Sequence, residues 1–275
     1  MLHLIPRAAL AFALALAGAS AATADIVVSG SFGPNGDLGF ANSPTNLSIS
    51  FGPSGAGSIS QMDLFVNAPG RDLGNGVGQS QGLSNAPLPG ISGSFSFTRP
   101  NANDLLLRYR LTNQTGSTLT GLQVFFYVDP DIGPRFDQDY VTRSGSLAGT
   151  PPFPQSFQAG DNQLSSLFTN LLNGALDNTN GATSTSPADV AMALGFQVAS
   201  LQSGSFVDVT VLLSDAGRSL GGLTLADNNA GAPGTGLTVS ATLVAVPEPS
   251  SLALALTAAL PCGLIAIRRH RKARG

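Results

Sequence analysis

The sequence has 275 residues, and its 13 basic and 16 acidic side chains leave a formal net charge of −3. This small charge hides a division along the chain. Residues 25–246 contain 15 Asp, no Glu and 7 Arg, a net charge of −8, whereas five basic residues lie within the last eight positions. Contacts to a phosphate backbone need clustered Lys and Arg, so this acidic body disfavours nucleic-acid binding.

The residue types that the body lacks exclude several kinds of chemistry. Residues 25–246 contain no Cys, His, Lys or Trp. This removes Ser–His and Cys–His nucleophile pairs, Schiff-base lysines, and thiolate or imidazole metal sites. A hydrolase with an Asp pair stays an alternative, although the body offers no Glu or Trp for a sugar-cleaving cleft. We therefore expect a protein that is not an enzyme and whose fold is held by packing without disulfide bonds.

The N-terminal segment is typical of a secretory signal peptide. Arg7 precedes the uninterrupted apolar run 8–18, and Ala22 and Ala24 supply the small side chains that a signal peptidase reads. We predict a signal peptide over residues 1–24, with signal peptidase as a partner during export. The body that follows then lies outside the cytoplasm.

Short runs rich in Val, Ile, Thr and Phe, separated by Gly, Asn and Pro, predict β-strands through the body. The expected strands are 26–32, 45–51, 58–66, 190–198, 206–213 and 237–246. Between them, the polar stretch 68–90 is rich in Gly, Pro, Asn and Ser, and we expect a long loop there.

The clearest local pattern covers residues 103–128. Apolar and polar residues alternate from Leu105 to Leu111, the polar stretch 113–117 turns the chain, and 119–128 returns with apolar residues on both faces. We predict an antiparallel hairpin at the centre of a sandwich. Its second strand is expected to be covered on both faces.

One segment departs from the β pattern. Five apolar residues recur at helical spacing, namely Leu164, Leu167, Phe168, Leu171 and Leu172. Asp161 can cap the start and Gly174 follows the end, so we predict an amphipathic helix over 161–173. The fold class is therefore mainly β: an antiparallel β-sandwich of about eight to ten strands with Greek-key-like connections and one short helix, as one domain over residues 25–245.

An acidic cluster follows the predicted central strand. Its members are Asp129, Asp131, Asp137 and Asp139. Carboxylates that converge repel one another unless a cation neutralises them, and Ca²⁺ accepts such oxygen ligands outside cells. The spacing does not match an EF-hand, because Tyr140 stands where its bidentate Glu belongs. Two interpretations stay open: a calcium site, and solvated loop carboxylates that pair with Arg135 and Arg143.

The last thirty residues, 246–275, have three parts. Pro247, Glu248 and Pro249 form a stiff, accessible peptide, because proline restricts itself and the residue before it. The apolar stretch 251–267 can span a bilayer as a helix. The end 268–275 carries the stop-transfer residues Arg268, Arg269, Arg271, Lys272 and Arg274, which by the positive-inside tendency stay in the cytoplasm.

This order of motif, apolar span and basic end resembles the PEP-CTERM sorting signal of exported bacterial proteins. In that family an exosortase, a membrane-embedded cysteine peptidase, is thought to process the motif. The resemblance implies an inner-membrane-anchored precursor that is then moved to the cell surface or the extracellular matrix. It also implies a link to exopolysaccharide and biofilm. A calcium-dependent carbohydrate-binding module of the cell envelope is the alternative, and calcium is the only cofactor under consideration.

Overall fold

The computed structural model describes residues 25–33, 43–53, 55–67, 77–78, 90–133, 135–146, 155–161, 166–232 and 234–246. The predicted signal peptide, residues 247–275 of the predicted sorting signal and most of the predicted 68–90 loop lie outside the described residues. No helix in the described part of the chain is long and apolar enough to cross a membrane.

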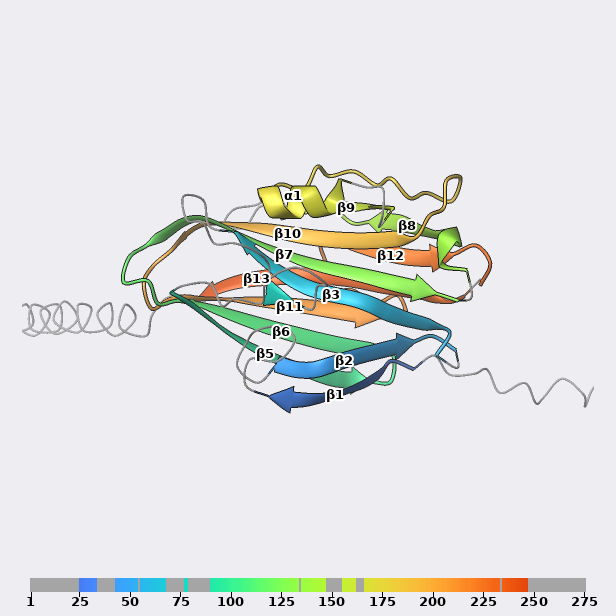
Figure 1. Cartoon of the computed structure of the whole chain (residues 1–275), viewed down its shortest axis with the longest axis horizontal. Coiled ribbons are helices and arrows are strands. Elements are labelled where there is room, and N and C mark those ends of the chain that lie inside the picture. Colours follow the sequence, from blue (N-terminus) through green and yellow to red (C-terminus); the bar gives the residue numbers. More distant parts are fainter. Residues whose placement is uncertain are drawn as a thin grey trace, which may run out of the picture.

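The described strands form two antiparallel sheets (Figure 1). The first sheet has seven strands in the order β1-β2-β3-β7-β10-β9, with β4 paired to β3. Its strands are β1 Val27–Gly33, β2 Ser43–Phe51, β3 Gly57–Asn67, β4 Val77–Gly78, β7 Leu119–Ile132, β9 Gln155–Asp161 and β10 Val190–Leu201.

The second sheet has six strands in the order β5-β6-β11-β13-β12-β8. Its strands are β5 Ile91–Asn101, β6 Asp104–Asn113, β8 Asp139–Ser144, β11 Phe206–Ser214, β12 Thr224–Asn229 and β13 Gly236–Val246. A 3₁₀ turn, η1 Phe136–Gln138, joins β7 to β8. The prediction of a mainly β sandwich with one short helix is confirmed, but the predicted eight to ten strands are too few, because the described part of the chain contains 13.

Side chains that alternate along each strand build the core between the sheets. In β11, Val207, Val209 and Val211 point inward and are buried. In β7, Val124 and Phe126 meet them from the first sheet. This is the period-two burial expected where two sheets pack face to face.

The outer face of the first sheet carries a second apolar cluster. There Phe125 and Tyr127 of β7 pack against α1, the helix Leu167–Asn173, through Leu167 and Leu171. Figure 1 shows α1 lying outside β9 and β10. Strand β7 is therefore covered on both faces, which confirms that prediction.

The helix begins later than predicted. Residues up to Asp161 belong to β9, which pairs with β10, and the N-cap is Ser166, whose side chain makes no capping hydrogen bond. The end agrees with the prediction, because Gly174 caps the helix in the left-handed conformation with φ of 71°.

The predicted central hairpin is wrong. Strand β6 pairs with β5 and β11, whereas β7 pairs with β3 and β10 in the other sheet. The turn at 113–117 therefore carries the chain from one sheet to the other. Asn113 holds this crossing, because its side-chain Nδ2 donates to the carbonyl oxygens of Ser117 and Leu201, both at 2.8 Å.

Segment 177–188 closes one side of the sandwich. The N–H of Ala159 in β9 donates to the carbonyl oxygen of Thr179 at 3.0 Å, and the N–H of Val141 in β8 donates to that of Ala182 at 3.0 Å. These two strands are edge strands of different sheets. The segment thus supplies hydrogen-bond partners to both, which protects edges that would otherwise be open to pairing with another chain.

Candidate functional site

The structure separates the four carboxylates at which the sequence suggested calcium. Asp129 and Asp131 lie near the end of β7, on the face turned away from the core, since their strand neighbours belong to the core cluster. Asp137 is exposed in η1 and pairs with Arg135 at 3.2 Å. Asp139 begins β8 and is fully buried. Among the described residues, no three acidic, His or Cys side chains are grouped so that they could hold one metal ion.

Asp139 lies inside the sandwich because it shares a face of β8 with the core residue Val141. Its Oδ2 accepts the backbone N–H of Ile132 at 3.2 Å, and its Oδ1 accepts the side-chain amide of Asn229 at 2.6 Å. Burial raises the pKa of Asp139 to about 7, although both hydrogen bonds act to lower it. The carboxyl group therefore titrates near neutral pH.

Asn229 ties the end of β12 to the turn between β7 and β8. Its Nδ2 contacts Asp139 Oδ1 and also the carbonyl oxygens of Ile132 and Arg135, each at 2.8 Å. Its Oδ1 accepts the N–H of Gly231 at 2.7 Å, which fixes the orientation of the amide. Three oxygens thus converge on one nitrogen that carries only two protons.

Asp227 is the residue that sequence reasoning missed. It lies in β12 two positions after the core residue Leu225, so its side chain points into the sandwich. It is 0% exposed, and neither of its carboxylate oxygens has a hydrogen-bond partner. Asp227 lies two positions after Leu225 and therefore shares its face in a strand, which was the available signal. No strand was predicted from the sequence over 224–229, so this signal was not used.

The environment of Asp227 strongly disfavours a lone negative charge. Burial raises its pKa well above the ordinary value, and the nearby charge of Asp139 raises it further. The backbone N–H of Asn228 acts in the opposite direction without reaching hydrogen-bond geometry with either oxygen. A carboxylate in such surroundings must bind a proton or a cation.

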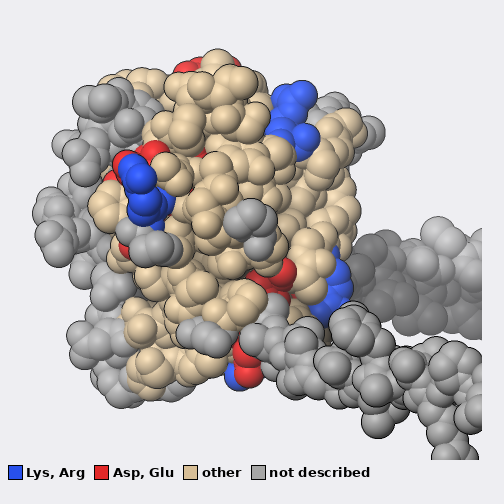
Figure 2. All heavy atoms as spheres, turned by 90° about the vertical axis from the view of Figure 1, so that its right-hand side faces the viewer, with Lys and Arg blue, Asp and Glu red and all other residues tan. Residues whose placement is uncertain are grey.

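A depression of about 400 Å³ lies at the same end of the sandwich. Its polar lining residues are Tyr140, Asp215, Asp227, Asn228, Asn229, Thr235 and Thr238. We call this end, with Asp139, Asp215 and Asp227, the acidic end. Figure 2 faces it and shows small separate groups of charged residues on a largely uncharged surface.

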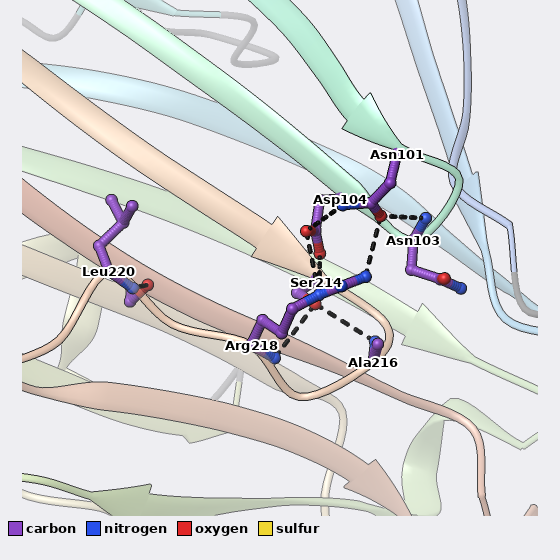
Figure 3. Close-up of polar contacts among 8 residues, drawn as sticks. Asn101, Asn103, Asp104, Ser214, Ala216, Arg218 and Leu220 are labelled. Atoms are coloured by element: carbon purple, nitrogen blue, oxygen red, sulfur yellow. Dashed lines mark hydrogen bonds and ion pairs between the residues drawn. The ribbon is translucent and has the colours of Figure 1, made fainter.

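A polar network holds the loop that follows β11 at this end (Figure 3). Arg218 pairs with Asp104 at 3.0 Å and donates to Asn101 Oδ1 at 2.9 Å, while Ser214 Oγ accepts the N–H of Arg218 at 3.2 Å. Burial alone would raise the pKa of Asp104, but hydrogen bonds from Asn101 and Ser214 and the Arg218 charge outweigh it and lower the pKa. This network is structural, because each charge in it has a partner.

A further buried carboxylate, Asp63, lies on the outer face of the first sheet opposite Tyr127. Its Oδ2 accepts the amide of Gln61 at 2.6 Å, and burial raises its pKa to about 6. Burial also raises the pKa of Tyr127, with contributions from Asp129, Asp63 and Asp189. This phenol therefore stays neutral and cannot serve as a base at ordinary pH.

Comparison with protein-family models finds no match to this sequence, and neither does comparison with curated proteins. The described residues thus define a class by structure, an antiparallel β-sandwich of two sheets with one short helix.

Proposed function

We propose that this chain is an exported, non-enzymatic β-sandwich protein that an exosortase sorts to the cell surface or extracellular matrix through residues 246–275. The observation that carries the proposal is the order of Pro247-Glu248-Pro249, apolar span and basic end. A signal peptide over residues 1–24 and a membrane helix over 251–267 belong to the same proposal. Association with exopolysaccharide follows from the resemblance of the tail.

The path of the chain supports this reading. Strand β13 pairs with β11 as far as Val246, whose partner is Phe206. The motif therefore begins at the residue directly after the last paired strand. Removal of the residues after Val246 would leave every described strand of the sandwich in place.

The buried carboxylates support a role without catalysis. Asp139 and Asp227 are fully buried, and Asp137 is paired with Arg135. A general acid or base has to come within hydrogen-bond reach of a substrate, and the two buried groups face the core. With no His, Cys or Lys between residues 25 and 246, few other groups are left for chemistry.

The test replaces Pro247, Glu248 and Pro249 together by Ala in the native host. We expect the variant to accumulate as an unprocessed precursor in the inner-membrane fraction, because the peptidase no longer has its motif. The matched control replaces the adjacent Ser250 and Ser251 by Ala, and it should be processed like the wild type. Normal processing and surface exposure of the triple variant would overturn the proposal.

A further inference from the structure

Two buried carboxylates face the same part of the interior at the acidic end. In the pairing of β12 with β8, Asp227 lies opposite Val141, and Asn229 lies opposite Asp139. Asp227 and Asp139 are therefore diagonal neighbours on the inner face of one antiparallel pair. Long side chains reach across such a diagonal, and the charge of Asp139 acts directly on Asp227.

No basic side chain neutralises this pair among the described residues. The arginines there that form ion pairs do so with other carboxylates, for example Arg135 with Asp137 and Arg218 with Asp104. The body contains no Lys or His at all. The unpartnered carboxylate of Asp227, at 0% exposure, thus lies diagonally across the strand pair from a second buried carboxylate, and neither forms an ion pair with a described basic side chain.

We propose that Asp227 and Asp139 together bind one calcium ion inside the acidic end of the sandwich. Asp227 would contribute its two unpartnered oxygens. Asp139 would contribute the oxygen lone pairs that are not already used in its hydrogen bonds. The carboxylates of this pair and the carbonyl oxygens of Ile132 and Arg135 are the oxygen type that Ca²⁺ prefers, whereas Asn229 presents its Nδ2 group to Asp139 and to both carbonyls. With only two carboxylates, neutral oxygens such as the Ile132 carbonyl would have to complete its coordination.

This set differs from the one that the acidic sequence cluster suggested. It keeps Asp139 and leaves out the other three members of the cluster, including the exposed Asp137. It adds Asp227, which lies 88 positions after Asp139 along the chain. The two strands that bring Asp139 and Asp227 together are neighbours only in the folded sheet. Bound calcium would therefore link the β7–β8 turn to β12 and stabilise the folded state.

The experiment uses the full-length protein, purified in detergent and freed of metal with EDTA. Calcium binding is measured by calorimetry, and thermal stability is followed with CaCl₂ or MgCl₂ at millimolar concentration. We expect about one calcium per chain and a rise in melting temperature of about 5 °C, the size that near-saturation gives a domain of this length. MgCl₂ should give a much smaller rise.

Two variants locate the site. Asp227→Asn keeps the shape of the side chain but removes its charge, and it should lose both the binding heat and the calcium-dependent rise. Asp137→Asn removes an exposed carboxylate of the sequence cluster and should behave like the wild type.

Absence of calcium binding by the wild-type protein would overturn the proposal and leave a proton as the partner of Asp227. Retained binding in Asp227→Asn would overturn the assignment of the site, and equal responses to both metals would overturn the assignment of calcium. None of these measurements involves the motif at 247–249. The calcium proposal can therefore be overturned without affecting the sorting proposal, and the reverse also holds.

Discussion

At the scale of single residues, Asp227 and Asp139 make stability depend on pH. Both carboxyl groups have a pKa above the ordinary value of 3.8 when the protein is folded, about 7 for Asp139. The folded state therefore binds more protons than the unfolded state between pH 4 and 7. By linkage, the free energy of unfolding then falls as pH rises through this window.

We predict that, in EDTA, the protein melts at a higher temperature at pH 5.5 than at pH 8. Asp63, Asp131 and Asp215 also have raised pKa values and contribute in the same direction. Asp227→Asn isolates one group. It should stabilise the protein at pH 8 by about 1–3 kcal/mol, because folding then no longer buries a carboxyl group that is freely ionised in the unfolded chain.

Thermal unfolding of the wild type and Asp227→Asn at the two pH values measures this effect. The difference between pH 5.5 and pH 8 should be smaller in the variant. Asp137→Asn is again the control, since its exposed side chain should leave the pH dependence as it is. An equal pH dependence in all three proteins would show that Asp227 is not the buried, unpartnered group described above.

At the scale of elements, segment 177–188 depends on the conformation of Asn178. This residue has φ of 61°, in the left-handed region that β-branched side chains rarely adopt. Its Oδ1 accepts the N–H of Phe157 at 3.0 Å, and its own N–H donates to the Phe157 carbonyl oxygen at 2.9 Å. Both its backbone conformation and its side chain therefore attach the segment to β9.

Asn178→Gly and Asn178→Val separate the two contributions. Both variants lose the side-chain hydrogen bond, which costs about 1 kcal/mol, but only Val adds backbone strain of about 1–3 kcal/mol. We expect the free energy of unfolding, measured in urea, to fall moderately for Gly and further for Val. Equal losses in the two variants would contradict a structural role for the left-handed conformation.

The sequence predicts which side chains of a strand face the core better than it predicts which strands pair with each other. Alternation correctly places Leu105, Leu107 and Tyr109 in the core. It cannot tell which strand lies alongside, because both β6 and β7 are long, apolar and separated by a short turn. Nearness in sequence favoured a hairpin, whereas β7 lies between β3 and β10 in the first sheet. In that position the core between the sheets covers one face of β7, and α1 covers the other.

The candidate site was predictable only in part, because the sequence does not tell which strands lie side by side. Asp139 belongs to a visible acidic cluster, but its partner Asp227 stands alone in a short polar strand. Only the pairing of β12 with β8 brings the two together. Strands such as β9 and β12, which contain two Gln and two Asn respectively, carry too little apolar pattern to be recognised without their neighbours.

At the scale of the whole molecule, β13 connects the acidic end to the tail that we propose is a sorting signal. It begins beside Asn228 and ends beside Phe206, at the opposite end of the sandwich. Figure 1 shows β13 and β12 running in opposite directions, with β12 ending at the side that Figure 2 faces. Eleven residues of extended strand span about 35 Å. A protein held by its C-terminal tail would therefore present the acidic end away from its attachment.

The central claim is that the tail is a processed sorting signal, and the intact mass of the mature protein tests it most directly. The protein would be isolated from its native host and from the same host without the exosortase. From the native host, we predict the mass of a chain that begins at Asp25 and ends near Pro247-Glu248-Pro249. From the host without the exosortase, we predict the mass of a chain with an unprocessed C-terminus. If the mass from both hosts still included residues 252–275, the tail would not be a processed sorting signal.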